Sequence, residues 1–212
     1  MAAFDHLVFA AARLDEGASY LAERLGVELE GGGRHAAQGT HNRLLGLGPS
    51  AYLEVIAIDP EGEKPPFPRW FGLDSPAVRR AIEQRPRLVN WVARTADIEA
   101  ASRETGGVLG EIRPMARGDL RWRMTFTADG GLIEGGLAPA LIQWDTADHP
   151  ASRLGDRGCR LQALAGGHPE PEVVADMLAR LGLTDVLSLE RSASGISLQA
   201  VIRTPGGQVT LD

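Results

Sequence analysis

Residues 4–10 read FDHLVFA, and the residues 14–25 that follow end in YLAERL before Gly26. The first stretch has the apolar content of a buried strand. Leu21 and Leu25 recur at helical spacing, and a glycine directly after such a pattern is typical of a helix C-terminus. The order strand, helix and glycine therefore predicts a βα unit at the start of the chain.

This order returns further along the sequence. Residues 177–182, MLARLG, align without a gap on residues 21–26, LAERLG. Counting 20 residues back from each final glycine reaches His6 (26 − 6) in the first unit and Gln162 (182 − 162) in the last. Asn90 takes the corresponding place in a shorter middle unit. Because a strand-helix-strand-strand-strand unit cannot bury both faces of a small sheet alone, we expect the repeats to pack side by side and share a core.

Turn signals divide the chain into three units, residues 1–84, 85–150 and 151–212. In the first unit, residues 40–47 and 51–58 predict two strands of a hairpin, because Gly-Pro-Ser lies between them. The three glycines at 31–33 predict a loop. The other two units repeat the alternation of strand-like and helix-like segments, which gives a mixed α+β organisation.

Composition and charge exclude several classes of protein. The chain has 212 residues, of which 43% are hydrophobic and 24% charged, so it can bury a substantial core. A net charge of −6 argues against a nucleic-acid partner. The single cysteine, Cys159, allows no intrachain disulfide and fits a reducing compartment. With no signal-peptide pattern and no apolar run near the ~20 residues of a membrane span, we expect no membrane partner and a cytoplasmic location.

The chain resembles the glyoxalase-like domain proteins of the vicinal oxygen chelate (glyoxalase/bleomycin resistance/dioxygenase) superfamily. The segments that carry the resemblance are residues 4–10, 39–42, 52–56, 90–95 and 141–145, and the residues from 160 onward resemble an additional C-terminal module. The resemblance implies an α+β fold in which repeated βαβββ modules form cupped mixed sheets with helices on the outer face, plus a third βα-type module. In metal-dependent members, a His on the first strand and a Glu on the last strand of a module bind one divalent cation, with a similar pair from the other module.

Strand alternation predicts which side chains face the cup. If Leu7 and Phe9 point to the helix, His6 points into the cup, and the same alternation in residues 51–58 turns Glu54 into it. His6 and Glu54 are therefore the candidate catalytic residues, and the resemblance makes them candidate metal ligands as well. Without a metal, a histidine and a carboxylate predict an acid-base pair that can move a proton next to a carbonyl. The alternative is that both are hydrogen-bonded remnants of an ancestral site.

The second unit departs from the family pattern. Asn90 stands where a second His is usual and Gln143 where a second Glu is usual, and neutral amide oxygens bind a cation more weakly. Alternation also turns Arg94 and Arg123 toward the cup. Guanidinium groups there indicate an anionic ligand, unless they neutralise Glu54 or lie at a solvated rim.

His41 and Asn42 complete the set of candidate substrate-binding residues, and the phase of their strand leaves open which of them faces the cup. The resemblance then implies one of two functions. The first is a lyase or isomerase that acts on a small, oxygen-rich, anionic metabolite, and it is favoured over a dioxygenase because non-haem iron prefers two His and one carboxylate. The alternative is a metal-free protein that binds or sequesters a small molecule. Superfamily members often form homodimers, so a homodimer is a further expectation.

Overall fold

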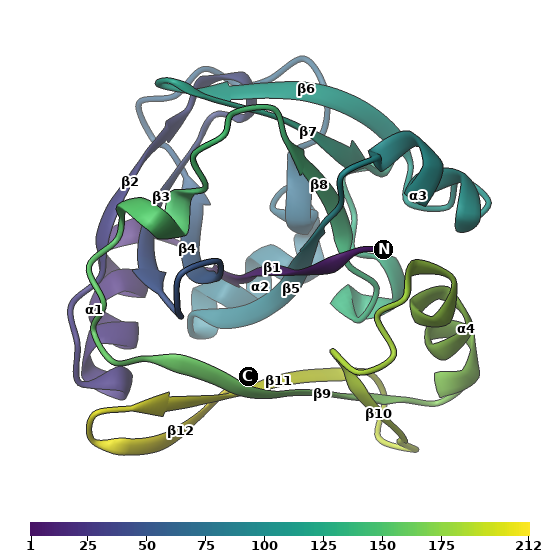
Figure 1. Cartoon of the computed structure of the whole chain (residues 1–212). Coiled ribbons are helices and arrows are strands. Elements are labelled where there is room, and N and C mark those ends of the chain that lie inside the picture. Colours follow the sequence, from purple (N-terminus) through teal and green to yellow (C-terminus); the bar gives the residue numbers. More distant parts are fainter.

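The computed structural model describes residues 1–212 and contains an eight-stranded sheet and a separate four-stranded sheet. The large sheet curls into a cup, as Figure 1 shows, and its strand order is β2-β3-β4-β1-β5-β8-β7-β6. Its strands are β1 (Ala3–Ala10), β2 (Glu30–His35), β3 (Thr40–Gly46), β4 (Tyr52–Ile58), β5 (Arg87–Arg94), β6 (Glu111–Arg117), β7 (Leu120–Phe126) and β8 (Ala140–Trp144). The predicted α+β class with a cupped mixed sheet is confirmed.

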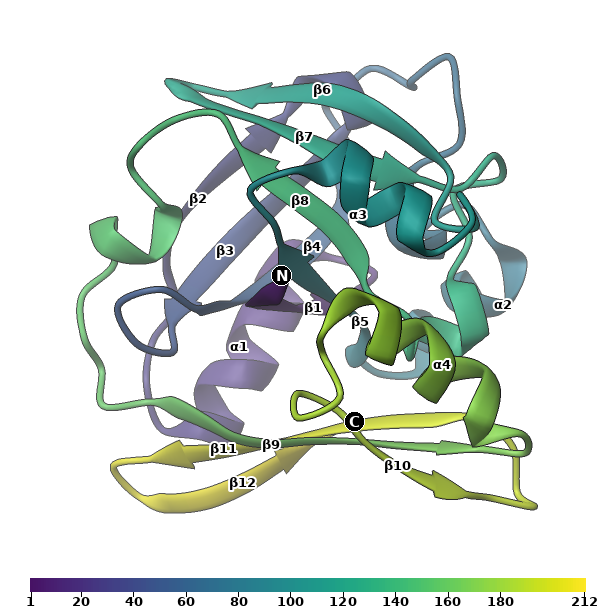
Figure 2. The same ribbon diagram turned by 45° about the vertical axis from the view of Figure 1, so that its right-hand side comes forward.

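The two halves of the cup have the same connectivity. In the first half, β1 is followed by α1 (Leu14–Leu25) and pairs in parallel with β4. In the second half, β5 is followed by α3 (Ile98–Glu104) and pairs in parallel with β8. The strands β1 and β5 meet antiparallel at the centre, and α2 (Pro76–Gln84) links the halves. The edge strands β2 and β6 approach each other on the far side, so the cup is nearly closed there (Figure 2).

The helix endings follow the sequence signal. Leu21 and Leu25 of α1 are buried, and Gly26 ends the helix in the left-handed conformation at a φ of 70°. The helix α4 (Pro171–Leu181) ends in the same way, at Gly182 with a φ of 71°. A side chain at either glycine would meet a steric penalty in this conformation, which explains why the two helix endings match in sequence. None of the helices combines the length and apolar character required to cross a membrane.

The curled sheet is buried on both faces. Leu7 and Phe9 of β1 point outward and pack in the main core, between the sheet, the helices and the C-terminal module. Val8 and Ala10 point inward and join a second core inside the cup. The outer core therefore holds the modules together, while the inner one narrows the cup around the site.

The third unit has the element order of the first but a different strand arrangement. Its elements are β9 (Arg160–His168), α4, β10 (Ser188–Arg191), β11 (Ser197–Thr204) and β12 (Gly207–Leu211). Their sheet order is β10-β9-β11-β12, and in Figure 1 this sheet lies beneath α1 and the centre of the cup. Gln162, which the repeat aligns with His6, is exposed, whereas His6 is buried. The third unit supports the cup from outside and brings no residue of its own strands into it.

One prediction of local structure was wrong, and one strand was missed. The glycines 31–33 belong to β2, because the strand bulges there and a Cβ at Gly32 would lie 2.1 Å from the Asn42 carbonyl oxygen. The strand β6 was not predicted, since Pro114 lies inside it. Proline lacks the N–H that a central strand needs, but β6 is the edge of the sheet, where that donor is not required.

Candidate active site

A polar pocket opens inside the cup between two different walls. One wall comes from β1 to β4 and carries polar groups, whereas the opposite wall comes from β7, β8 and the turn Trp70–Gly72 and is mostly aromatic. The pocket encloses about 330 Å³ including its mouth. Its lining residues are His6, His35, Asn42, Tyr52, Glu54, Trp70, Phe71, Arg117, Trp122, Met124, Ile142 and Trp144.

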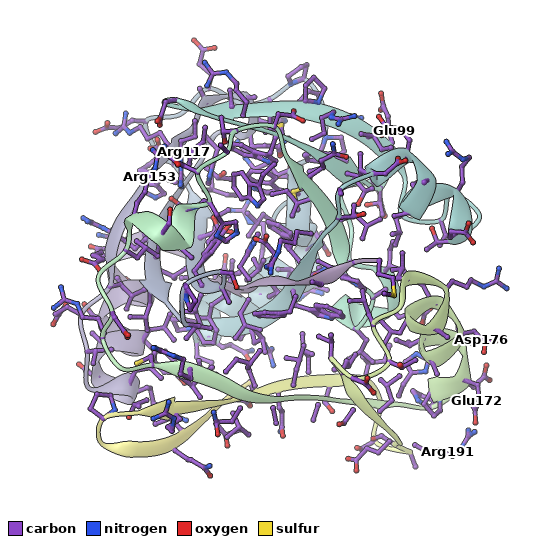
Figure 3. The ribbon with its side chains drawn as sticks, viewed as in Figure 1. Glu99, Arg117, Arg153, Glu172, Asp176 and Arg191 are labelled. Carbon is purple, nitrogen blue, oxygen red and sulfur yellow. The ribbon has the colours of Figure 1, made fainter.

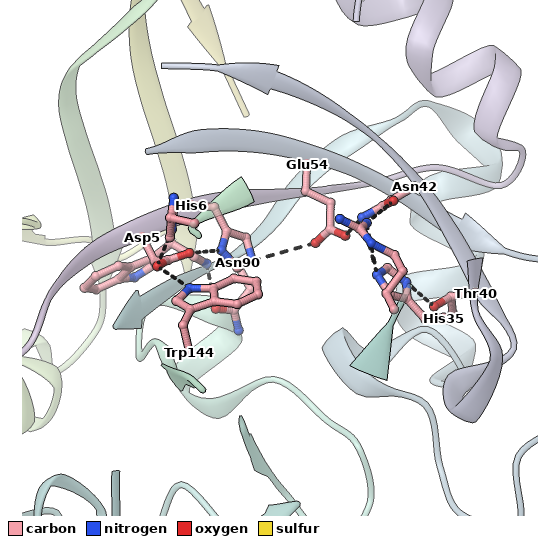
Figure 4. Close-up of polar contacts among 11 residues, drawn as sticks. Asp5, His6, His35, Thr40, Asn42, Glu54, Asn90 and Trp144 are labelled. Atoms are coloured by element: carbon pink, nitrogen blue, oxygen red, sulfur yellow. Dashed lines mark hydrogen bonds and ion pairs between the residues drawn. The ribbon is translucent and has the colours of Figure 1, made fainter. Parts of the chain in front are cut away.

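A fully buried carboxylate holds His6 in place. Asp5 Oδ1 lies 2.7 Å from His6 Nδ1, and Oδ2 accepts hydrogen bonds of 3.0 Å from Trp144 Nε1 and from His149 Nε2 (Figure 4). Burial opposes ionisation of Asp5, but the hydrogen bonds and charges of His149 and His6 outweigh it and hold the pKa of Asp5 well below its usual value. Because an ionised carboxylate only accepts, Nδ1 of His6 carries a proton and donates it to Asp5, which turns Nε2 toward the pocket.

His6 faces the second candidate residue across a short gap. Its Nε2 lies 3.7 Å from Glu54 Oε2, and both side chains are about 95% buried, with relative exposures of 3% and 5%. The imidazole stacks on Tyr52 with ring centroids 4.4 Å apart. Burial, together with Asp5 and Glu54, raises the pKa of Tyr52 well above its usual value, so its hydroxyl keeps its proton. A base, a carboxylate and a neutral phenol therefore meet in one small volume.

Asn42 connects this pair to the edge of the cup. Its Nδ2 donates to Glu54 Oε1, while its Oδ1 accepts from Gly33 N at 2.9 Å and from Arg117 Nη1 at 2.6 Å. His35 lies beside it and is held through Nδ1 by the Thr40 hydroxyl at 3.2 Å. Burial, helped by the charge of Arg117, lowers the pKa of His35 well below its usual value, so this imidazole is neutral.

Arg117 supplies the positive charge of the pocket. It reaches over β2 from the end of β6, and the missing side chain of Gly33 leaves it room, since a Cβ there would lie 3.3 Å from Arg117 Cδ. Only its Nη1 is bonded within the protein, to Asn42, with His35 Nε2 at 3.5 Å. No carboxylate lies within ion-pair distance, so the remaining guanidinium donors are available to an anionic ligand (Figure 3 labels Arg117).

The residues present do not fit a divalent metal centre. His6 and Glu54 are two suitable ligands, but no third His, Cys, Asp or Glu side chain is placed to hold one metal ion together with them. Zinc sites use at least three protein ligands, and the half of the cup that would complete the set offers Ile142 and Trp144 instead. The Arg117 charge beside Asn42 would further oppose a cation.

The structure brings some of the sequence candidates together and separates others. Asn42 faces the pocket and His41 lies on the outer face of β3, paired with Ala57, which settles the choice left open by the sequence. Arg94 braces the N-terminal strand, because its Nη1 donates to the carbonyls of Phe4 and Ser50. Asn90 faces a separate cavity further along the cup.

The predicted inward orientation of Arg123 and Gln143 is wrong. Arg123 bonds Glu99 of α3 and Asp145, and Gln143 Oε1 accepts from Ile98 N at 2.9 Å, all on the outer face. Because Arg123 was expected to face the cup, its apolar neighbours in β7 (Trp122, Met124 and Phe126) were expected to face the helix. They line the cup instead, because α3 is too short to cover that face and leaves it polar and partly exposed.

Six residues that carry hydrogen-bonding groups of the site were not among the candidates: Asp5, His35, Tyr52, Arg117, Trp144 and His149. Asp5 directly precedes the candidate histidine, and an acidic neighbour of a predicted catalytic imidazole is a signal that local sequence carries. The others depend on contacts between distant segments. His149, for example, bonds a residue 144 positions away.

The cup of two βαβββ halves and the one-sided polar site define a glyoxalase-like protein. The sequence matches the family of glyoxalase-like domain proteins over residues 4–182, and the chain belongs to this family. No protein with a curated description matches the sequence.

One solved structure shares the fold over nearly its whole length. A hypothetical protein from Staphylococcus aureus superposes with a TM-score of 0.68 at 16% identity, over 96% of this chain and 91% of that one. Methylmalonyl-CoA epimerase from Streptomyces coelicolor gives 0.44 at 17% identity, covering 68% of this chain and 97% of the epimerase. The epimerase from Mycobacterium tuberculosis gives 0.41 at 20% identity, covering 68% and 88%. At these values, the likeness to the epimerases says nothing of what this chain catalyses.

Proposed function

We propose that this glyoxalase-like protein is an isomerase or lyase that moves a proton next to the carbonyl group of a small, oxygen-rich, anionic metabolite. The observation that carries the proposal is the arrangement of Asp5, His6 and Glu54 beside the unpaired guanidinium of Arg117. A buried, oriented base next to a cation suits the deprotonation of a carbon acid that carries a negative charge.

His6 is the proposed general base. Its Nε2 takes the proton from the carbon next to the carbonyl, and the electron pair of the broken C–H bond moves to the carbonyl oxygen to form an enolate. Asp5 stabilises the imidazolium that results, because its ionised carboxylate accepts the Nδ1 proton. The proton then returns to carbon from either side, as in an isomerase, or the enolate expels a group from the next carbon, as in a lyase.

Glu54 and Tyr52 are the proposed partners in proton transfer. Glu54 Oε2 lies 3.7 Å from His6 Nε2, so a substrate carbon that lies in front of the pair can contact one group that removes a proton and a second that returns it. The Tyr52 hydroxyl, kept protonated by burial, is suited to donate a hydrogen bond to a developing oxyanion. Two groups on one wall are enough for the exchange, and no step requires the divalent cation that the family pattern suggested.

Arg117 and Asn42 are the proposed anion-binding residues. Arg117 has donors without protein partners, and Asn42 fixes its guanidinium through a 2.6 Å hydrogen bond. A carboxylate or phosphate held there would place the neighbouring carbonyl carbon near His6. The anion-binding role that the sequence suggested for Arg94 and Arg123 is therefore proposed for Arg117, on the edge strand β6.

A metal-free binding protein remains the second candidate, and the aromatic wall favours it. Trp122 and Trp144 lie with ring centroids 5.4 Å apart, and the second half of the cup adds no acid or base to the pocket. Such a wall suits retention of a flat ligand as well as catalysis. The two candidates differ in whether carbon-bound protons exchange.

Deuterium exchange separates the candidates. Pyruvate, an anionic ketone, is incubated in D2O with the chelator-treated protein, and loss of its methyl proton signal is followed by NMR, with neutral hydroxyacetone as the uncharged comparison. We expect faster exchange for pyruvate, and a decrease of about 10²-fold or more in His6→Gln. The matched control is His41→Gln, the same change on the outer face of β3. Saturable pyruvate binding with no exchange above the His6→Gln level would support the binding protein instead.

A further inference from the structure

A second cavity lies next to the polar pocket and differs from it in charge. It encloses about 390 Å³ including its mouth. The fourteen residues that line it include no charged side chain: Trp70, Phe71, Asn90, Leu109, Met124, Thr125, Phe126, Thr127, Gly130, Gly131, Ile133, Ala138, Pro139 and Ala140. We call it the neutral cavity. Trp70, Phe71 and Met124 line both spaces and form the wall between them.

Two residues that line the neutral cavity carry a donor without a protein partner. Asn90 has a relative exposure of 5%, and its Oδ1 accepts from Trp91 N at 2.6 Å, whereas its Nδ2 makes no hydrogen bond. The indole Nε1 of Trp70 is also buried without a partner. Buried polar groups are normally paired, so donors left free at a cavity point to an acceptor supplied by a ligand or by water.

The register of the strands gives the distance between the two sites. Val8 of β1 stands opposite Glu54 of β4 on one side and Asn90 of β5 on the other. Glu54 and Asn90 thus lie in one row across three neighbouring strands, which places their Cα atoms about 10 Å apart. A single molecule of moderate length can therefore span from the acid-base pair to the Asn90 amide.

The wall between the spaces is held in a strained conformation. Phe71 has a φ of 56°, one of two non-glycine residues with positive φ, and it stacks on Trp70 with centroids 5.4 Å apart. This conformation disfavours a large side chain and persists where the surroundings enforce it. Met124, a flexible and adaptable apolar side chain, lies on the same wall and contacts both spaces.

We infer that the neutral cavity binds the uncharged end of the same substrate. The ligand class is an amphiphilic oxo acid: a charged, enolisable head in the polar pocket and an apolar aryl or acyl end that carries a neutral acceptor, such as a ketone oxygen, about 10 Å away. Asn90 Nδ2 donates to that acceptor, and Met124, Phe126 and Leu109 contact the apolar part. This inference rests on the proposed function only for the identity of the head group.

Small uncharged probes test binding in the neutral cavity without the charged head group. Acetophenone, an aryl ketone, and ethylbenzene, the same shape without the acceptor, are titrated into ¹⁵N-labelled protein. We expect acetophenone to shift the Asn90 side-chain amide signal and to bind about fivefold more tightly than ethylbenzene, the usual effect of one neutral hydrogen bond. Asn90→Ala should remove the difference, while Gln199→Ala, an exposed amide on β11, should preserve it.

A second variant keeps the inference testable if Asn90→Ala fails to fold. Ala140→Leu fills the cavity from a half-buried position at the start of β8 and should weaken both probes at least tenfold while leaving pyruvate binding unchanged. Acetophenone shifts that avoid the neutral cavity, or equal binding of acetophenone to Ala140→Leu and the unaltered chain, would overturn the inference. If the inference fails but pyruvate exchange persists, the proposed function is unaffected. If acetophenone binds in the neutral cavity but pyruvate does not exchange, only the proposed function is refuted.

Discussion

The two walls of the cup come from halves with the same connectivity, yet they differ in chemistry. The β1–β4 wall presents His6 and Glu54 to the pocket, and the β7–β8 wall presents Trp122, Ile142 and Trp144. One half supplies the acid-base groups, and the other supplies shape and an apolar environment in which charges interact more strongly. The difference shows that the two halves can differ in polarity and still share a charged site, because Trp144 of the second half donates a hydrogen bond to Asp5 of the first.

The largest effect is expected from removing the Asp5 carboxylate. In Asp5→Asn, an amide replaces the carboxylate that accepts from His6, Trp144 and His149. Because one buried acceptor is exchanged for a donor that faces N–H groups, we expect a loss of about 3 kcal/mol in the free energy of unfolding. Pyruvate exchange should fall at least 100-fold as the wrong His6 tautomer becomes favoured.

Urea denaturation and the exchange assay measure the two consequences of Asp5→Asn. Asp148→Asn, an exposed carboxylate near Arg153, is the control and should change neither. If Asp5→Asn kept the stability and exchange rate of the unaltered protein, the polar wall would not depend on Asp5.

A smaller effect is expected from the cation at the edge of the cup. Arg117→Met should raise the KM for pyruvate about tenfold or more and change kcat little, since the guanidinium binds the anionic group and does not transfer the proton. The exchange of neutral hydroxyacetone should not change. Arg43→Met, an exposed arginine on β3, is the matched control. An equal decrease for both ketones would argue that Arg117 has a structural role.

The pH dependence of stability tests His35. Its folded pKa lies well below the usual value near 6.5, so the folded protein gains stability above pH 6.5 from the neutral form and loses it as the pH falls toward the folded pKa. Below pH 6.5, this residue should cost up to about 1.4 kcal/mol per pH unit. In His35→Gln, urea denaturation between pH 8 and 5 should show a flatter profile. An unchanged slope would contradict a buried neutral His35.

Much of the fold was predictable because local sequence determines it. The helix endings at Gly26 and Gly182 and the inward turn of His6 and Glu54 follow from glycine conformation and from strand alternation. A glutamate among the apolar residues of β4 was itself the sign that Glu54 belongs to a polar site.

The second half of the site was not predictable from the same rules. Alternation separates the two faces of a strand but does not say which face points inward when both are covered. The predicted orientation of the β7 side chains was therefore reversed. Trp122, Met124 and Phe126 are as apolar as an outer core face. Arg117 and His149 reach the pocket only because the sheet curls and the chain returns from the second half, which no local pattern records.

The smallest effect on pyruvate exchange is expected from the removal of divalent metal ions. Two ligands on one wall, an apolar wall opposite and a nearby guanidinium do not make a divalent site, so pyruvate exchange should stay within about twofold after chelation. Elemental analysis should find far less than one metal per chain, in the unaltered protein and in His6→Ala alike. About one metal per chain, lost in His6→Ala, would mean that ligand binding or rearrangement brings further donors to His6 and Glu54. The asymmetry of the two walls would then describe only the metal-free state of the cup.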